Sequence, residues 1–438
     1  MTNARHHVGD STGRMRPSPN TMRLQTLALL LSFALLPLQG QEQPSESPPL
    51  SGALRKSGLP DDREGVTIPL KPTFSGFTVE VEIDGKPVQL VLDTGASTTV
   101  LTQEAAKRLG LKAKEYGRIE IRDITGTKLE IHRALTKRIS LGKAWTENEP
   151  VMITKMPKGF FDGLLGIGTL ADWDVRINPA EKTLTLLPGG KAKPLDGETV
   201  IRLSCELVNP EASSSNPPGH RSLNLLVPVR LGSHVIAATP DTGYGGALRV
   251  PSALMNKFAP EVMKEALPAL LQTVGISGGK ASRAAKLPEF TLGTDTLREL
   301  PVEVSDAAPG SSAEREGIVG LNLLRHYVMT FRFSAGELRL KPLGTVQEIT
   351  RASTAGINLG IGDGGRIVVL SAVPEGPGAK AGIRAGDELL EIEGRPLRTM
   401  KPTEFTAFKQ LPPGASVKVR YRRGENKPVE AKLVLIKE

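Results

Sequence analysis

The chain contains the same tripeptide twice, and the segments around the two copies also repeat. Asp93-Thr94-Gly95 ends the apolar run VQLVL, and Asp241-Thr242-Gly243 follows the run HVIAATP. A single tripeptide of this kind arises by chance in a long sequence and would carry little weight. Two copies in matched surroundings indicate that one structural unit has been duplicated within the chain.

The same predicted elements occur in the same order around each of the two tripeptides. Before each copy, two stretches of alternating apolar residues flank a glycine, Gly85 or Gly232. After it come a predicted helix (LTQEAAKRLGL or VPSALMNKF), two more strands around a glycine, and an apolar-apolar-glycine step that ends at Gly166 or Gly320. Alternation on both sides of a glycine is typical of β-hairpins. The pattern predicts two lobes of mainly β structure, over residues 66–190 and 200–345.

With these landmarks, residues 66 to 345 resemble the retropepsin-like aspartic proteases, specifically the bacterial kind with both lobes in one chain. The resemblance implies two β-barrel lobes, each of which gives one aspartate, Asp93 or Asp241, to a catalytic dyad. It also implies that the hydroxyls of Thr94 and Thr242 brace one another across the lobe interface. The glycines of the turns and of the segments that cross beneath the aspartates are then Gly95, Gly243, Gly166 and Gly320.

The second copy departs from the pattern of this family. A small residue usually follows the tripeptide, as Ala96 does in the first copy. In the second copy, Tyr244 stands at this position and is followed by Gly245-Gly246. We expect the tyrosine ring either to crowd the dyad or to shape a subsite.

A pair of carboxylates suits the hydrolysis of a peptide bond. Two carboxylates within about 3 Å of one another cannot both ionise, so the pair holds one proton and its two apparent pKa values separate. The ionised member can take a proton from water, and the protonated member can donate a hydrogen bond to the developing oxyanion. This chemistry needs no metal and no cofactor, and the 6 histidines show no metal-ligand spacing.

Each lobe also contains a candidate flap to cover the substrate. In the first lobe, the stretch GRIEIRDITGTKLEIH alternates on both sides of Thr125 and Gly126, as expected for a hairpin. In the second lobe, Gly278 and Gly279 stand at the matching place. We expect the two flaps to hold the substrate and to limit the access of water.

The C-terminal residues 350–438 form a separate predicted unit. The stretch AKAGIRAGDELLEIEG is the most specific part of a resemblance to bacterial PDZ domains, which have an α+β fold. PDZ domains add an extended peptide to a sheet edge and capture its terminal carboxylate on backbone N–H groups. Asn358 departs from the family, where glycine or an apolar residue is common, and packing between domains is the alternative role. The resemblance implies a peptide site at Gly356, Ile357, Asn358, Leu359, Gly360, Ile361, Phe405 and Phe408.

Residues 1–40 are predicted to be a leader that contains a secretory signal peptide. Translation is expected to begin at Met22, with Met15 as the alternative, and an arginine then precedes an apolar stretch that ends near a small residue, Gly40. This stretch is too short to span a bilayer permanently. Residues 41–65 are predicted to be a linker. We therefore expect an exported protein, periplasmic or secreted, with no transmembrane anchor in the mature chain.

The charge pattern argues against nucleic-acid binding, and the cysteine content excludes an internal disulfide. The formal net charge is +9, and the basic residues are dispersed without the basic-aromatic pattern typical of nucleic-acid binding. The sole cysteine, Cys205, cannot form an internal disulfide, so the domains must be held by their cores alone. The expected partners are polypeptide substrates and, at the C-terminal unit, peptide C-termini, with no nucleic acid.

The sequence therefore predicts an exported aspartic endopeptidase whose C-terminal unit recruits peptides. The alternative is a catalytically inactive peptide-binding or scaffold protein that acts mainly through its PDZ domain. Cleavage of an unfolded polypeptide at mildly acidic pH by the wild type, and not by Asp93→Asn, distinguishes the two.

Overall fold

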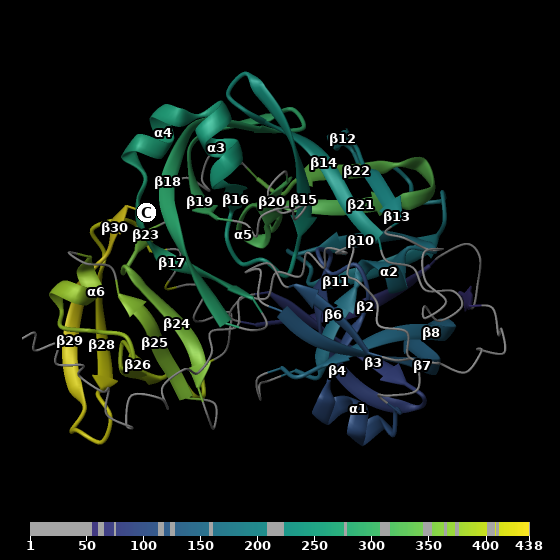
Figure 1. The fold of residues 1–438 in the computed structure, drawn as a ribbon, viewed down its shortest axis with the longest axis horizontal. Helices are drawn as coiled ribbons and strands as arrows, with labels where there is room; N and C mark the ends of the chain where they lie inside the picture. Colours follow the sequence, from purple (N-terminus) through teal and green to yellow (C-terminus); the bar gives the residue numbers. More distant parts are fainter. Residues whose placement is uncertain are drawn as a thin grey trace, which may run out of the picture.

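The protein consists mainly of β-strands, arranged in two lobes and a smaller C-terminal domain (Figure 1). The mainly β fold predicted from the sequence is thus confirmed. The predicted leader, the flap tip at Thr125 and Gly126, and Phe405 lie outside the described residues. The computed structural model describes residues 55–59, 65–73, 76–112, 118–122, 128–156, 161–207, 223–275, 278–306, 316–344, 353–362, 366–372, 376–400, 408 and 411–437.

The first lobe forms because apolar residues alternate along its strands and so fill one face of a curved sheet. Along β3, for example, Val79, Val81 and Ile83 are buried whereas Glu80 and Glu82 are exposed. The elements of this lobe are β1 (Lys56–Gly58), β2 (Val66–Pro72), β3 (Phe77–Ile83), β4 (Lys86–Asp93), β5 (Val100–Thr102), α1 (Gln103–Leu109), β6 (Arg118–Arg122), β7 (Lys128–Leu141), β8 (Ala144–Thr154), β9 (Gly163–Gly166), α2 (Ile167–Leu170), β10 (Trp173–Asn178) and β11 (Thr183–Pro188).

The second lobe repeats this order of elements. Its strands carry the same alternation, so that β14 buries every second residue from Leu223 to Leu231. The elements are β12 (Thr199–Arg202), β13 (Ser204–Leu207), β14 (Leu223–Leu231), β15 (His234–Asp241), β16 (Leu248–Pro251), α3 (Ser252–Phe258), α4 (Pro260–Glu265), β17 (Leu267–Gly275), β18 (Gly278–Leu292), β19 (Asp295–Ser305), β20 (Glu316–Gly320), α5 (Leu321–Leu324), β21 (Tyr327–Arg332), η3 (Phe333–Ala335) and β22 (Glu337–Pro342).

The predicted hairpins before the two aspartates are present. In the first lobe, β3 and β4 join through a two-residue turn in which Asp84 and Gly85 have φ of 52° and 76°. Positive φ at both positions gives a turn whose twist matches that of the strands. In the second lobe, Gly232 has φ of 57° in the turn between β14 and β15. These turns fix the register of the strands that end at the aspartates.

The predicted helices after the tripeptides are also present. Helix α1 begins after Thr102, whose side-chain oxygen accepts a hydrogen bond from the N–H of Ala105 at 3.0 Å. It ends at Gly110, which has the left-handed conformation with φ of 82°. These are the capping residues that helix ends favour. Helix α3 occupies the matching place in the second lobe.

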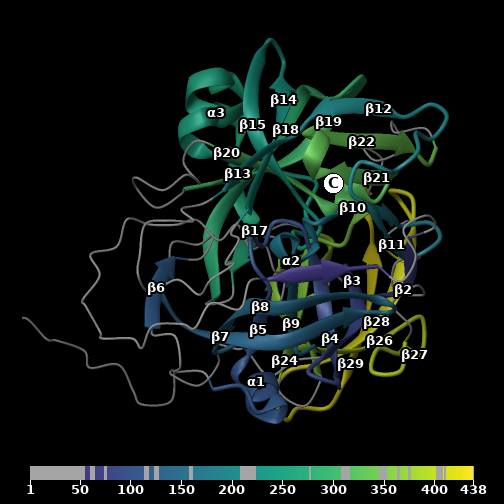
Figure 2. The ribbon, with the colours of Figure 1, turned by 90° about the vertical axis from the view of Figure 1, so that its right-hand side faces the viewer.

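A continuous set of strands joins the two lobes. β10 of the first lobe pairs antiparallel with β21 of the second, with Arg176 opposite Thr330. The joined strands follow the order β12-β22-β21-β10-β11-β2 (Figure 2). One cluster of buried apolar residues runs through both lobes, and Val175 and Phe331 belong to it at this junction. The lobes therefore share a core and are held in a fixed relation.

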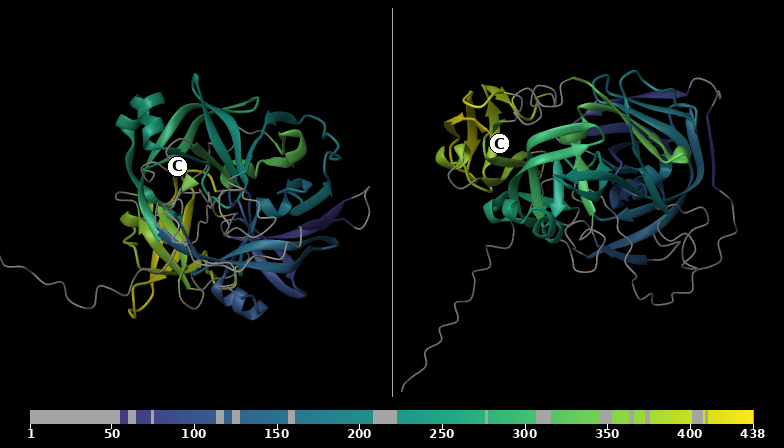
Figure 3. Two further views of the ribbon diagram at one scale, coloured as in Figure 1. Left: turned by 45° about the vertical axis from the view of Figure 1, so that its right-hand side comes forward. Right: turned by 90° about the horizontal axis from the view of Figure 1, so that it is seen from above.

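The C-terminal domain has its own core. Ile383, Leu389 and Leu433 belong to a cluster that is separate from the core of the lobes. The domain lies beside the second lobe (Figure 3), where β17 contacts β24 and β25. Its elements are β23 (Ser353–Thr354), β24 (Ile357–Gly362), β25 (Arg366–Ala372), α6 (Pro377–Lys380), β26 (Glu388–Ile392), β27 (Arg395–Pro396), β28 (Ser416–Arg422), β29 (Val429–Val434) and β30 (Ile436–Lys437).

Part of the range predicted as a linker, 41–65, belongs to the first lobe. Strand β1 pairs antiparallel with β8. Arg55, which precedes it, forms buried ion pairs with Glu149 and Asp172 and donates to the carbonyl of Thr169 at 3.1 Å. A guanidinium group can satisfy several acceptors at once in a fixed geometry, which explains why the chain is anchored here.

Arg55→Ala is expected to lower the free energy of unfolding by about 3–5 kcal/mol, because it leaves a buried carboxylate without its cation. Arg108 provides a matched control: it pairs with Asp162, but half of its side chain is exposed at 51%. Its replacement by alanine is expected to cost less than about 1 kcal/mol. Chemical denaturation measures both values, and equal losses would contradict the structural role of Arg55.

Candidate active site

The two aspartates of the repeated tripeptides meet at the junction of the lobes. Asp93 ends β4 and Asp241 ends β15, and both are fully buried, at 0% exposure. A Cβ atom on Gly95 would lie 2.4 Å from the carboxyl carbon of Asp241. Only glycine therefore allows the turn of one lobe to approach the carboxylate of the other.

Each carboxylate is held in the same way by its own turn. Oδ1 of Asp93 accepts hydrogen bonds from the N–H groups of Gly95 at 3.0 Å and Ala96 at 2.9 Å. Oδ1 of Asp241 accepts from Gly243 at 2.7 Å and Tyr244 at 3.0 Å. Backbone donors cannot rotate away, so they fix the orientation of both carboxyl groups.

The pKa of Asp93 is raised well above its ordinary value. Burial is the largest cause, followed by the negative charge of Asp241 and a hydrogen bond with the Asp241 side chain. The N–H groups of Ala96 and Gly95 oppose the shift because they favour the charged form. Two carboxyl groups that interact in this way titrate as a coupled pair.

Two threonines connect the turns across the interface. The N–H of Thr94 donates to Oγ1 of Thr242 at 3.1 Å, and the N–H of Thr242 donates to Oγ1 of Thr94 at 3.0 Å. Each hydroxyl in turn donates to a carbonyl of the opposite lobe, that of Pro240 at 2.6 Å and that of Leu92 at 2.8 Å. Four buried hydrogen bonds therefore fix one turn against the other.

The apolar-apolar-glycine steps lie directly beside the aspartates. β4 pairs parallel with β9 so that Asp93 is opposite Gly166, and β15 pairs with β20 so that Asp241 is opposite Gly320. A Cβ on Gly166 would lie 2.3 Å from the carbonyl carbon of Thr98. A Cβ on Gly320 would lie 2.2 Å from the backbone oxygen of Gly246 in the same way. Both positions require glycine because the returning turn packs on them.

Both regions predicted as flaps contain hairpins. In the second lobe β17 and β18 pair up to the turn, with Gly275 opposite Gly278 and Val274 opposite Gly279. In the first lobe β6 pairs with β7 from Arg118 to Arg122. The predicted tip at Thr125 and Gly126 lies outside the described residues.

Tyr244, the residue after the second tripeptide, lies in the interior of the second lobe beside Ile318. Its side chain is buried and its hydroxyl donates to Oε2 of Glu303 on β19 at 2.5 Å. Glu303 and Arg249 are buried charged residues that the motif analysis missed. The available signal was weak: each is a charged residue within a short apolar strand sequence, ALRVP or LPVEVS.

The predicted peptide site of the C-terminal domain is partly described. Gly356 is buried with φ of 64°, and Ile357, Asn358, Leu359, Gly360 and Ile361 lie on β24, which pairs with β25 and is the edge strand of the sheet that the described residues form. Ile357, Leu359 and Phe408 pack against the core of the domain. Phe405 lies outside the described residues.

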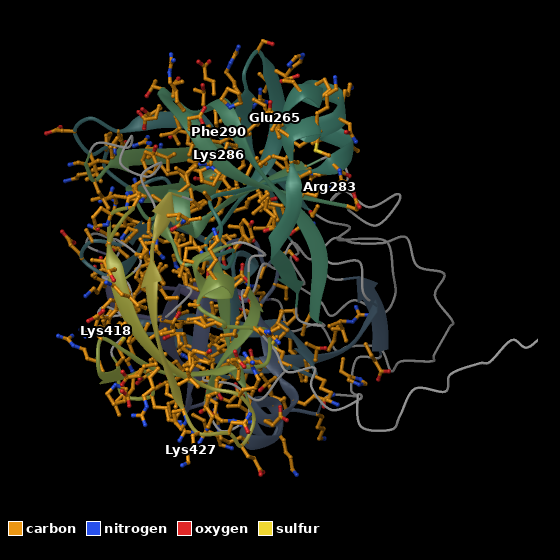
Figure 4. All side chains as sticks on the ribbon, turned by 90° about the vertical axis from the view of Figure 1, so that its left-hand side faces the viewer. Glu265, Arg283, Lys286, Phe290, Lys418 and Lys427 are labelled. Atoms are coloured by element: carbon orange, nitrogen blue, oxygen red, sulfur yellow. The ribbon has the colours of Figure 1, made fainter. Side chains whose placement is uncertain are left out.

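Neither a metal site nor a membrane span is found in the described parts of the chain. No group of three or more His, Cys, Asp or Glu side chains there could hold a metal ion. None of the described helices is long and apolar enough to cross a membrane. Basic side chains are spread over different domains: Arg283 and Lys286 are on the second lobe, and Lys418 and Lys427 are on the C-terminal domain (Figure 4).

Comparison with protein families places two parts of the chain. Residues 79–172 match the family described as "gag-polyprotein putative aspartyl protease". The first lobe is a retropepsin-like aspartyl protease domain. The match spans both the Asp93 turn and the Gly166 step, and the second lobe repeats the same strand order and register. Residues 368–423 match the PDZ domain family, so the C-terminal domain is a PDZ domain.

Comparison with whole proteins finds a distant similarity. A search of curated proteins finds no match to the chain. The solved structures that resemble it include the crystal structure of the aspartic proteinase from Irpex lacteus, at 14% sequence identity and a TM-score of 0.40. The similarity covers 64% of this chain and 97% of that one.

The threonine contacts of the retropepsin-like site can be tested by deleting one hydroxyl. Thr242→Val keeps the shape of the side chain but leaves the N–H of Thr94 and the carbonyl of Leu92 without a partner. Each buried unsatisfied group costs about 1–3 kcal/mol. We expect thermal stability and peptidase activity to fall together. Thr67→Val, which removes a hydroxyl from an exposed pair with Thr185 on the lobe surface, is the control and should change neither. An unchanged melting temperature in Thr242→Val would contradict the cross-lobe contact.

Proposed function

We propose that the chain is an exported aspartic endopeptidase in which Asp93 and Asp241 form the catalytic dyad. One observation carries this proposal: two fully buried aspartates, one from each lobe, are brought together by their turns, and the negative charge of Asp241 contributes to the raised pKa of Asp93. A buried carboxylate is costly unless it has a partner. A pair that offers one acid and one base on adjacent atoms suits the hydrolysis of a peptide bond.

The reaction follows from the two protonation states. The ionised carboxylate takes a proton from a water molecule while the water oxygen attacks the scissile carbonyl carbon. The protonated carboxyl group donates a hydrogen bond to the carbonyl oxygen as negative charge develops there. When the tetrahedral intermediate collapses, the C–N bond breaks and the leaving nitrogen receives a proton from the dyad. Both carboxyl groups return to the shared-proton state.

The hydrogen bonds around the dyad support this role by fixing its geometry in advance. Four backbone N–H groups hold the inner carboxylate oxygens, and the contacts between Thr94 and Thr242 hold the two turns together. Groups that need not reorganise during the reaction lower its barrier. The backbone bonds occupy Oδ1 of each aspartate, and we assign the contacts with water and substrate to the Oδ2 atoms.

The PDZ domain is proposed to recruit polypeptides by their C-termini. Its edge strand β24 offers backbone groups to an added peptide strand, and the turn at Gly356 precedes that strand. Export, periplasmic or extracellular, is proposed from the apolar stretch of the leader sequence alone. Unfolded or partly unfolded chains in that compartment are the expected substrates.

Asp93→Asn and Asp241→Asn are each expected to lower kcat/KM for an unfolded polypeptide by about 10²–10⁴-fold at mildly acidic pH. The double variant should be no worse than either single variant, because residues that act as one unit give losses that do not add. Product formation measured by mass spectrometry tests this. A single variant with near wild-type turnover would show that the dyad is assigned wrongly.

The free energy of unfolding of these variants shows whether a loss of activity comes from the missing carboxyl group or from a loss of folded protein. A carboxyl group whose pKa is raised on folding contributes stability below its unfolded pKa and loses it as the pH rises through the folded pKa. Asp93→Asn should therefore unfold no more easily than the wild type at pH 7. Below about pH 4, the wild-type carboxyl is protonated in both the folded and the unfolded state. Any gain in unfolding free energy of Asp93→Asn over the wild type should therefore disappear there.

A chain that ends at Leu343 is expected to keep the core of the lobes, because the PDZ core forms a separate cluster. Its rate on a short, freely diffusing peptide should stay within several-fold of the wild-type rate. Its rate on a protein substrate with an accessible C-terminus should fall further, since tethering raises the effective concentration. Equal losses on both substrates would contradict a recruiting role.

A further inference from the structure

The two retropepsin-like lobes differ in chemistry at matched positions beside the dyad. In the first lobe, Val100 pairs with Met152 on one side and Leu164 on the other. In the second lobe, Arg249 holds the same place, between Glu303 and Ile318. Ala96 and Tyr244 are the matched residues after the tripeptide. An apolar cluster in the first lobe is thus replaced by a buried tyrosine, arginine and glutamate in the second.

The first lobe fixes its catalytic turn with a chain of hydroxyl groups. Oγ1 of Thr99 accepts from the N–H of Gly166 at 3.1 Å and lies 2.7 Å from Oγ1 of Thr169. The hydroxyl of Thr169 donates to Oε1 of Glu149 at 2.8 Å. Glu149 is in turn paired with Arg55. The turn after Asp93 is therefore connected to a buried glutamate on β8 and to a buried arginine.

The second lobe has no hydroxyl at the matched places. The residue before Arg249 is Leu248, where the first lobe has Thr99 before Val100. The third residue after Gly320 is Leu323, where the first lobe has Thr169. Both leucines are buried. The chain of hydroxyl groups that ties the first turn to its glutamate is therefore absent here.

Tyr244 provides a different connection to a buried glutamate. Its N–H donates to Oδ1 of Asp241 at 3.0 Å, and its carbonyl accepts from the N–H of Leu321 at 2.7 Å. Its hydroxyl donates to Glu303 at 2.5 Å. One residue thus joins the catalytic carboxylate, the segment after the glycine step and strand β19.

The surrounding residues are shaped for this ring. A Cβ on Gly246 would lie 2.4 Å from the hydroxyl oxygen of Tyr244, and a Cβ on Gly320 would lie 2.4 Å from its Cδ1. The second glycine of the Gly245-Gly246 pair therefore leaves room for the phenol. Arg249 is held beside Glu303 and donates from Nε to the hydroxyl of Ser305 at 2.6 Å. Burial raises the pKa of Glu303, and the charge of Arg249 opposes that shift.

We propose that Tyr244 is a positioning residue for Asp241, and that the Tyr244–Glu303 hydrogen bond replaces the hydroxyl chain of the first lobe. This inference rests on the proposed function, because it assigns Tyr244 a part in the same site. The substitution that departs from the family pattern thus supports the dyad and does not obstruct it. The two lobes reach the same carboxylate geometry through different buried networks.

Tyr244→Phe tests the proposal because it removes only the hydroxyl. We expect kcat on a short peptide to fall roughly 10-fold, as for one lost hydrogen bond to a charged group, with KM within about 2-fold of wild type. Amide hydrogen exchange should quicken in residues 241–249 and stay unchanged in residues 93–100. Tyr327→Phe, at a fully buried tyrosine of the same lobe that is not on the catalytic turn, is the matched control and should change neither readout.

Glu303→Gln supplies a conservative partner, since its amide oxygen can still accept from the phenol. It should lower kcat less than Tyr244→Phe does, and the double variant should be no worse than Tyr244→Phe alone. Unchanged kcat and unchanged exchange in Tyr244→Phe, or an equal effect of Tyr327→Phe on the 241–249 exchange, would overturn the proposal. A wild type that cleaves no peptide would contradict the proposed function, whereas hydrogen exchange would still decide whether Tyr244 holds the turn.

Discussion

The structure depends on keeping two buried carboxyl groups in contact. Asp93 and Asp241 repel one another when both are charged, and burial makes each charge more costly still. The protein opposes this repulsion with backbone N–H groups and with the cross-lobe bonds of Thr94 and Thr242. These bonds have fixed positions only because the lobes also share a sheet and a core. The distant pairing of β10 with β21 is thus part of the support of the site.

Duplication explains why the two aspartate turns have the same geometry. The buried residues that hold each turn nevertheless differ between the two lobes. Each aspartate turn is connected to a buried glutamate that is accompanied by an arginine. In the first lobe these are Glu149 and Arg55, reached through threonine hydroxyls. In the second lobe Glu303 is reached directly by the phenol of Tyr244. The first route ends at Arg55, at the N-terminal edge of the first lobe, whereas the second ends at Glu303 on β19 of the second lobe.

The PDZ domain, unlike the two lobes, contributes no residue to the aspartate pair and its cross-lobe hydrogen bonds. Its core is separate from that of the lobes. It is nevertheless placed against β17, which belongs to the hairpin predicted to be the second flap. The sites proposed for peptide recruitment and for peptide cleavage therefore belong to adjoining parts of one chain.

Sequence patterns determined those features that rest on local chemistry. Alternating apolar residues and glycines at hairpin turns predicted the strands and the turns, and the stretches LTQEAAKRLGL and VPSALMNKF predicted the helix that follows each tripeptide, because each feature depends on neighbours in the chain. The repeat also placed Gly166 and Gly320 in matching positions. Only the tertiary structure decided what Tyr244, Glu303 and Arg55 do. Their partners lie 59 to 117 residues away, and no local pattern indicates which buried charge will meet which. That choice is made by strand pairing and burial, which bring a hydroxyl or a guanidinium group to a carboxylate far along the chain.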